Sequence, residues 1–345
     1  MSGSAAALLS VQDLSVQFAS GDGVVKAVSE VSLDVGACET IGIVGESGCG
    51  KSTLAKAIMR LHPASSGRIA VQGQDITDLS LDALRPVRPL VQMIFQDPYH
   101  SLNPRHTVGK IIGRPLEVAR WRRADIAERV HVLMNQVGLP ADAYHRYPHE
   151  FSGGQRQRIG IARALALQPR LLICDEPVSA LDVSIRAQVM NLLQDLKEQL
   201  GISFLFISHD LSMIRHFSDR LLVMYLGRVV ETGSAEALWR NPAHPYTKAL
   251  MATAPIANPK AARARQRVTL EGDLPSPLNL PPGCSFAGRC AFAAPLCHAQ
   301  RPDLRAGPDG RRFACHFDLW DVPFGAMPAP VSPMPASKEI THAVE

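Results

Sequence analysis

Residues 45–52 read Gly45-Glu46-Ser47-Gly48-Cys49-Gly50-Lys51-Ser52, which matches the pattern G-x-x-x-x-G-K-[ST]. The stretch follows an expected strand at residues 39–44 and opens an expected helix at residues 52–61. Glycines there let backbone N–H groups converge on phosphate oxygens, and the helix N-terminus adds a favourable dipole. We predict that Lys51 contacts the β- and γ-phosphates of a nucleotide and that Ser52, beside Thr53, ligates Mg²⁺.

The composition is that of an ordinary globular protein. The 345 residues are 46% apolar and 20% charged, and the length suggests about two domains. Lys plus Arg exceed Asp plus Glu by only four, which argues against a nucleic-acid partner. No run approaches the roughly 18 apolar residues of a membrane span, and the N-terminal sequence is not that expected of a secretory signal.

Periodicity around the glycine-rich stretch favours an α/β domain. Residues 9–18 alternate and then meet a turn signal at residues 20–23, which predicts a hairpin. Short apolar runs at 171–174, 202–207 and 221–226 flank a helical stretch at 183–200, as in buried parallel strands. Residues 107–168 carry helical spacing with little strand signal, which predicts a helical insertion.

Two further motifs carry chemistry. The apolar strand at residues 171–174 ends in Asp175 and Glu176, for which packing gives no reason. Asp175 is predicted to hold Mg²⁺, and Glu176 to orient and deprotonate an attacking water. Ser152, followed by Gly153, Gly154 and Gln155, begins a helical run and predicts a second anion-binding helix N-terminus.

The order of these elements resembles the ATP-binding subunit of ABC transporters over roughly residues 8–255. The shared elements, in chain order, are the phosphate loop, Gln96, the sequence SGGQ at 152–155, Asp175-Glu176, the sequence SALD at 179–182, and His209. The resemblance implies a P-loop NTPase fold with a RecA-like α/β core, an antiparallel β subdomain and a helical insertion. It also implies an ATPase.

The resemblance assigns further roles residue by residue. Phe18 occupies the aromatic position that stacks on adenine, and Gln96 the position that senses Mg²⁺ and the attacking water. His209 is the histidine that contacts the γ-phosphate, so the implied catalytic residues are Glu176, His209 and Gln96. The segment Ser152 to Gln155 implies a signature that meets the γ-phosphate held by the opposite subunit, with Asp182 close to it. Phe151 stands where the family more often has Leu.

A narrower resemblance, to the peptide/nickel uptake subfamily, rests on residues 176–184, 241–247 and the region from 283 to 315. It implies a second ATPase subunit, as a heterodimer more than a homodimer, together with two permease subunits and an extracytoplasmic solute-binding protein. The implied place is the cytoplasmic face of a bacterial inner membrane. Within it the chain is most similar to the second ATPase subunit of dipeptide and oligopeptide permeases, which implies an ATPase that energises uptake of di- or oligopeptides or a related solute. A soluble ABC ATPase outside transport stays the alternative, and the sequence does not identify the transported solute.

Four of the seven cysteines crowd near the C-terminus. Cys284, Cys290, Cys297 and Cys315 have the spacing C-x5-C-x6-C-x17-C, which lacks the close pairs of a structural zinc site. Iron–sulfur clusters tolerate looser spacing, and the subfamily extension is associated with [4Fe–4S]. The interpretations are therefore a [4Fe–4S] cluster, zinc, or free thiols. Because these cysteines lie far in sequence from every nucleotide motif, we expect a structural role.

These patterns divide the chain into four parts. We expect a nucleotide-binding domain at 1–255, with its helical subdomain at about 97–170, and a linker at 256–272. A small irregular cysteine-rich extension follows at 273–320, and a proline-rich tail at 321–345 is expected to be disordered.

Overall fold

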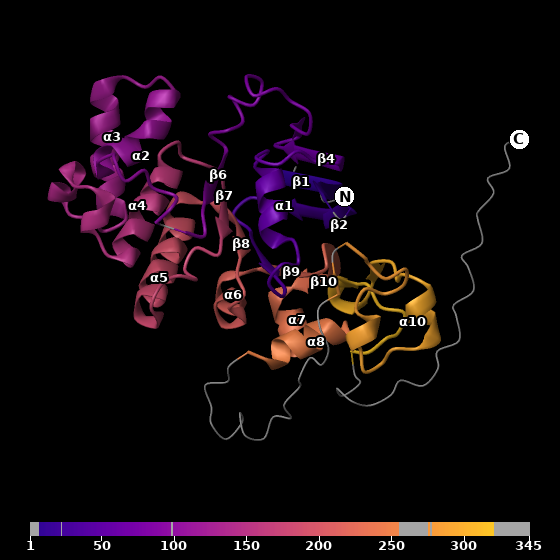
Figure 1. Cartoon of the computed structure of the whole chain (residues 1–345). Coiled ribbons are helices and arrows are strands. Elements are labelled where there is room, and N and C mark those ends of the chain that lie inside the picture. Colours follow the sequence, from indigo (N-terminus) through magenta and orange to yellow (C-terminus); the bar gives the residue numbers. More distant parts are fainter. Residues whose placement is uncertain (1–6, 22, 98, 255–274, 277, 321–345) are drawn as a thin grey trace, which may run out of the picture.

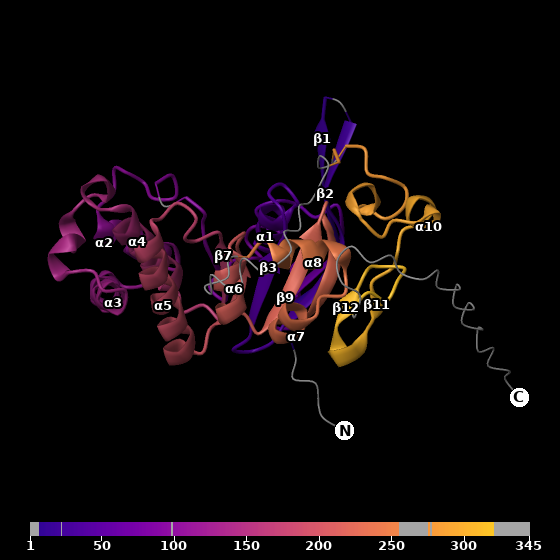
Figure 2. The same ribbon diagram turned by 90° about the horizontal axis from the view of Figure 1, so that it is seen from below.

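The computed structural model describes residues 7–21, 23–97, 99–254, 275–276 and 278–320 (Figure 1). The expected linker at 256–272 and the expected tail at 321–345 lie outside these residues. Two sheets, a group of helices at one end and the cysteine-rich extension at the other end make up the rest (Figures 1 and 2).

The larger sheet has eight strands in the order β11-β12-β10-β9-β3-β8-β7-β6. Its bounds are β3 (Thr40–Val44), β6 (Val91–Ile94), β7 (Leu171–Asp175), β8 (Ser203–Ile207), β9 (Arg220–Tyr225), β10 (Arg228–Ser234), β11 (Arg305–Ala306) and β12 (Arg312–Phe313). Neighbouring strands from β9 through β3, β8 and β7 to β6 are parallel to one another. Strands β10, β12 and β11 extend the sheet beyond β9, and each pairs antiparallel with its neighbour. Every residue of β3, β7 and β8 is buried, which explains their continuous apolar runs.

The smaller sheet is antiparallel, in the order β2-β1-β4-β5. Its strands are β1 (Leu9–Ser20), β2 (Gly23–Val35), β4 (Ser66–Val71) and β5 (Gln74–Asp75). The predicted hairpin is confirmed, since Ser20 pairs with Gly23 across the turn. A single apolar cluster joins the inner faces of β1, β2 and β4 to one face of the larger sheet and to helix α1 (Lys51–Ile58).

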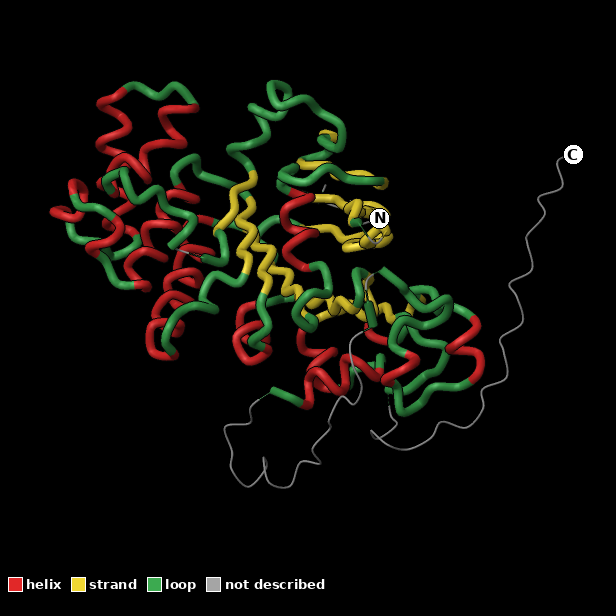
Figure 3. Tube along the Cα trace, viewed as in Figure 1, coloured by secondary structure: helices red, strands yellow, loops and turns green. Residues whose placement is uncertain are grey.

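The opposite face of the larger sheet packs on helices through a second apolar cluster. The helices on this side are α5 (Val183–Leu200), α6 (Leu211–Phe217), α7 (Ala235–Arg240) and α8 (Pro245–Ala252). In Figure 3 the strands of the larger sheet lie between α1 on one side and these helices on the other. The result is a layered α/β core, as the sequence predicted.

The segment predicted as a helical insertion is helical. In the described residues 99–170 the structure has helices and 3₁₀ turns and no strand. They are α2 (Val108–Val118), α3 (Arg123–Gln136), η1 (Ala141–His145), η2 (Pro148–Glu150) and α4 (Gly153–Leu165). Figures 1 and 2 both place this group beyond β6 and β7, at the end farthest from the C-terminal region.

The cysteine-rich extension is attached to the core more closely than the sequence indicated. It holds η3 (Ala287–Arg289), α10 (Pro295–Ala299), η4 (Pro308–Gly310) and the short strands β11 and β12. Strand β12 pairs with β10, so the extension continues the larger sheet. Its own small apolar cluster includes Phe292, Phe313 and Leu319. Strands of two residues are too short for an alternating pattern, which is why the sequence did not predict them.

Candidate functional site

The glycine-rich loop between β3 and α1 has the backbone that its sequence predicts. Gly45, Gly48 and Gly50 have φ of 155°, 79° and 99°, values that L side chains rarely adopt. A Cβ on Gly45 would lie 2.2 Å from the carbonyl oxygen of Met224, and one on Gly50 would lie 2.1 Å from that of Ala27. The loop therefore packs closely against β2 and the end of β9, and only glycine fits at positions 45 and 50.

Lys51 lies inside this loop. Its side chain is buried, and Nζ donates to the carbonyl oxygens of Gly45 and Glu46 at 2.8 Å each. Nζ also lies 3.6 Å from Sγ of Cys49, whose pKa burial raises. The ammonium is thereby fixed in the loop whose backbone encloses phosphate oxygens in proteins with this motif.

A cavity of about 220 Å³ opens beside the loop. Its lining comes from the loop and α1, from the ends of β6 and β7, from β2, and from the turn after β9. The residues are Val25, Lys26, Ala27, Ser47, Gly48, Gly50, Lys51, Ser52, Thr53, Gln96, Glu176, Leu226 and Gly227. The predicted phosphate loop and two of the predicted catalytic residues thus share one cavity.

Ser52 and Asp175 meet as the metal prediction requires. The hydroxyl Oγ of Ser52 donates to Oδ1 of Asp175 at 2.8 Å. Burial raises the pKa of Asp175, and the hydrogen bond from Ser52 opposes that shift. Mg²⁺ takes oxygen ligands and commonly binds one or two protein groups along with phosphates and waters. A hydroxyl and a carboxylate at the mouth of a phosphate loop fit that requirement.

Glu176 stands at the centre of the predicted catalytic group. Gln96 donates through Nε2 to its Oε2 at 2.9 Å, and Nδ1 of His209 lies 3.3 Å from the same oxygen. The three side chains follow β6, β7 and β8, whose carboxyl ends meet at one edge of the parallel sheet. Glu176 has a left-handed backbone with φ of 47°, a conformation that is uncommon outside glycine and is often found at functional sites.

The signature segment lies apart from this cavity. Ser152 caps α4, where its Oγ accepts from the Gln155 backbone at 3.4 Å and the Gln155 side chain accepts from the Ser152 backbone at 3.0 Å. Asp182 begins α5 and is exposed, without a side-chain capping bond. None of residues 152–155 or 182 lines the cavity, although Gly153 and Gly154 lie near the start of α5, facing Leu181 and Ile185 respectively.

Phe18 is also outside the cavity lining. It pairs in register with Val25, which does line the cavity, and its ring packs edge-on against His62 at 5.3 Å between centroids. The predicted adenine contact therefore stays a prediction, supported by the position of the neighbouring strand.

Tyr246 is a contact of the loop that sequence reasoning missed. Its hydroxyl accepts the Glu46 backbone N–H at 2.8 Å, and the ring is fully buried. Tyr246 lies in the segment 241–247, which in the sequence supported only the resemblance to the peptide/nickel uptake subfamily. The contact spans 200 positions, so no local signal pointed from Tyr246 to the loop.

The four C-terminal cysteines converge in space. Cys284, Cys290, Cys297 and Cys315 all line one cavity of about 10 Å³, room for about one water. Burial raises the pKa of Cys284, and that of Cys290 and Cys315 to about 12. Across the part of the chain described, no group of three or more His, Cys, Asp or Glu side chains is arranged to hold a metal ion. The structure therefore brings the four predicted ligands together but does not show a metal site among the described residues, and the iron–sulfur or zinc centre stays a prediction.

Comparison with known families agrees with this site. The profile described as "ABC transporter" matches residues 28–179, and the profile described as "Oligopeptide/dipeptide transporter, C-terminal region" matches residues 230–297. The first match holds the phosphate loop, the SGGQ segment and the Asp175-Glu176 pair; the second holds Tyr246 and three of the clustered cysteines.

Individual relatives align over nearly their whole length. The chain is 52% identical over 308 residues to the oligopeptide transport ATP-binding protein OppF of Salmonella typhimurium, covering 86% of this chain and 92% of that protein. It is 51% identical over 296 residues to the oligopeptide transport ATP-binding protein AppF of Bacillus subtilis, covering 85% and 90%.

A solved structure shares the fold. One chain of the dimeric ATP-binding cassette MJ0796, solved in a post-hydrolysis state bound to ADP and phosphate, superposes with a TM-score of 0.60 at 27% identity, covering 66% of this chain and 98% of that one. Among the helices that the structure describes here, none combines the length and apolar character needed to cross a bilayer.

Proposed function

The chain belongs to the ABC transporter ATP-binding protein family, and we propose that it is the ATP-hydrolysing subunit of an importer for di- or oligopeptides. Membership makes it an ATPase. The observation that carries the transport assignment is the match of residues 230–297 to the C-terminal region of oligopeptide and dipeptide transporters. Soluble ABC ATPases outside transport are the alternative, and that match favours the transporter.

The geometry supports a division of work at the nucleotide site. Lys51 and the backbone of the phosphate loop bind the β- and γ-phosphates, while Ser52 and Asp175 would hold Mg²⁺. When bound, Mg²⁺ supplies positive charge that offsets the phosphate oxygens. Glu176 orients and deprotonates the attacking water, and Gln96 and His209 hold its carboxylate in place.

A complete site requires a second cassette. One chain supplies one phosphate loop and one signature, and residues 152–155 lie outside its own nucleotide cavity. We propose that the signature acts in trans on a partner ATPase subunit, which is a different chain. Two permease subunits and an extracytoplasmic solute-binding protein would complete the transporter, with this chain at the cytoplasmic face of the membrane.

Ser152→Ala tests the role in trans. The chain should bind Mg·ATP as before, whereas hydrolysis at the partner's site in the assembled dimer should fall about 10²–10³-fold, since a donor to the γ-phosphate is lost. Nucleotide affinity by calorimetry and phosphate release by the dimer are the two measurements.

Ser234→Ala is the matched control, because Ser234 caps α7 as Ser152 caps α4. Both substitutions should cost about 1 kcal/mol of stability through the lost cap. If the two variants hydrolysed ATP at equal rates, Ser152 would have no role at the partner's nucleotide site.

We also propose that the four clustered cysteines hold a [4Fe–4S] cluster. Four thiols around one cavity, two of them buried and two half-buried, are the donor set that such clusters use. Protein purified without oxygen should contain about four iron atoms per chain and absorb broadly in the visible range.

Cys290→Ser should abolish the iron and the absorbance, while Cys38→Ser, at an exposed thiol outside the group, should leave both intact. Protein that contains zinc, or no metal at all, contradicts this assignment.

A further inference from the structure

The phosphate loop is bonded to the cysteine-rich extension. Arg289 donates from Nη1 to Oε2 of Glu46 at 2.7 Å and from Nη2 to Oε1 at 3.0 Å. Glu46 is the second residue of the loop, 243 positions away. The Arg289 side chain is only 6% exposed and that of Glu46 is 22% exposed, so solvent screens this two-point ion pair weakly.

Glu46 is fixed at its backbone as well. Its N–H donates to Tyr246, and its carboxylate binds Arg289, whose Nη1 also lies 3.4 Å from the hydroxyl of Tyr225. Phe286 of the extension packs against both tyrosine rings, at 5.4 and 5.5 Å between centroids. The rings of Tyr225 and Tyr246 from the core and of Phe286 from the extension therefore pack together beside the loop, where Tyr246 holds the Glu46 N–H.

The peptide that carries this N–H is part of the phosphate site. The N–H that Tyr246 holds belongs to the Gly45–Glu46 peptide, whose Gly45 carbonyl oxygen accepts from Lys51 Nζ, as does the carbonyl of Glu46 in the next peptide. A rotation of the Gly45–Glu46 peptide would therefore move an acceptor that orients the lysine. An unpaired Glu46 carboxylate would also add a negative charge beside the place where phosphates bind.

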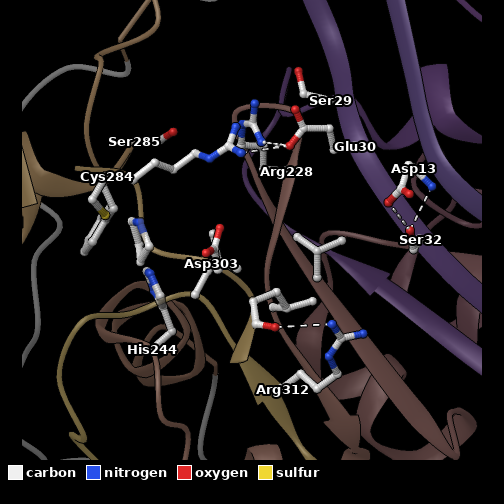
Figure 4. Close-up of a pocket in the computed structure, with 17 residues that line it drawn as sticks. Asp13, Ser29, Glu30, Ser32, Arg228, His244, Cys284, Ser285, Asp303 and Arg312 are labelled. Atoms are coloured by element: carbon white, nitrogen blue, oxygen red, sulfur yellow. Dashed lines mark hydrogen bonds and ion pairs between the residues drawn. The ribbon is translucent and has the colours of Figure 1, made fainter. Parts of the chain in front are cut away.

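The extension that carries Arg289 is held in place independently. Arg289 lies in η3, which Cys284 and Cys290 bracket, and the thiols of both cysteines line the four-cysteine cavity. A second ion pair joins Arg301 of the extension to Glu30 of β2 at 3.0 Å, and Glu30 also binds Arg228 at 2.9 Å. Figure 4 shows Cys284 and Ser285 across a cavity of about 210 Å³ from Asp13 and Ser32.

We infer that Arg289 is a positioning residue for nucleotide binding, so that the cysteine-rich extension forms part of the phosphate site through the Arg289–Glu46 pair. Arg289 acts by holding the Glu46 carboxylate away from the phosphates and by fixing the peptide that orients Lys51. The inference rests on the proposed nucleotide site.

The test measures Mg·ATP affinity of the purified full chain by calorimetry. Arg289→Met should weaken binding on the order of tenfold, because the charge next to the phosphates is left unpaired. Arg289→Lys, which retains the charge but not the two-point geometry, should lose less.

The double variant Glu46→Gln with Arg289→Met separates positioning from support of the fold. Removing the unpaired carboxylate should restore at least half of the lost binding free energy, as in a double-mutant cycle of coupled residues. Damage to the fold of the extension would not be repaired by a change at Glu46.

Arg301→Met is the control, since it breaks an ion pair of the extension away from the loop and should leave affinity within about twofold. Wild-type affinity in Arg289→Met, or no recovery in the double variant, overturns the inference. Absence of binding in the unmodified chain would instead overturn the proposed nucleotide site.

Discussion

Glu176→Gln is expected to bind Mg·ATP and to lose about 10²–10⁴-fold in turnover, the usual contribution of a general base. The amide has nearly the same shape and can still be contacted by Gln96 and His209, which lie 2.9 and 3.3 Å from Oε2 of the native carboxylate. It cannot accept a proton from water. Binding and chemistry should therefore separate in this variant.

The measurements are nucleotide affinity and phosphate release of the assembled dimer. Glu198→Gln, which changes an exposed carboxylate on α5 in the same way, is the matched control and should leave turnover unchanged. Near-normal hydrolysis by Glu176→Gln would transfer the role of base to another group.

Lys51→Ala is expected to abolish measurable nucleotide binding or turnover. The buried ammonium is held by two carbonyl oxygens of the loop and supplies positive charge where the β- and γ-phosphates bind. Its removal leaves both carbonyls without that donor and the phosphates without a buried counter-charge, which costs several kcal/mol.

Calorimetric titration with Mg·ATP measures the loss. Lys110→Ala removes an exposed lysine from α2 and should bind ATP like the unmodified chain. If Lys51→Ala retained both affinity and hydrolysis, the glycine-rich loop would not be the phosphate site.

The local parts of the site were predictable because each carries its chemistry in consecutive residues. A glycine-rich stretch between strand and helix specifies its own backbone, and the carboxylates at 175–176 follow a buried strand. The roles of Gln96 and His209 came from the resemblance, and the structure brings both to Glu176 because parallel strands end at one edge of a sheet.

The long-range supports of the loop were not predictable. Tyr246 and Arg289 reach Glu46 from 200 and 243 positions away, and a single tyrosine or arginine in an irregular segment has no pattern that indicates a partner. The expectation of a purely structural cysteine region rested on distance along the chain. The structural role of the cysteines stays a prediction, but distance along the chain did not indicate that η3, between two of them, contacts the phosphate loop directly.

The pairing of β12 with β10 has a consequence for synthesis on the ribosome. Strand β10 leaves the ribosome long before β12, so during translation its outer edge presents unpaired N–H and C=O groups. Unpaired edges recruit strands of other molecules and promote aggregation. Strand β12 covers part of this edge, so a chain that ends before residue 312 is expected to expose the edge of β10 and to aggregate more readily.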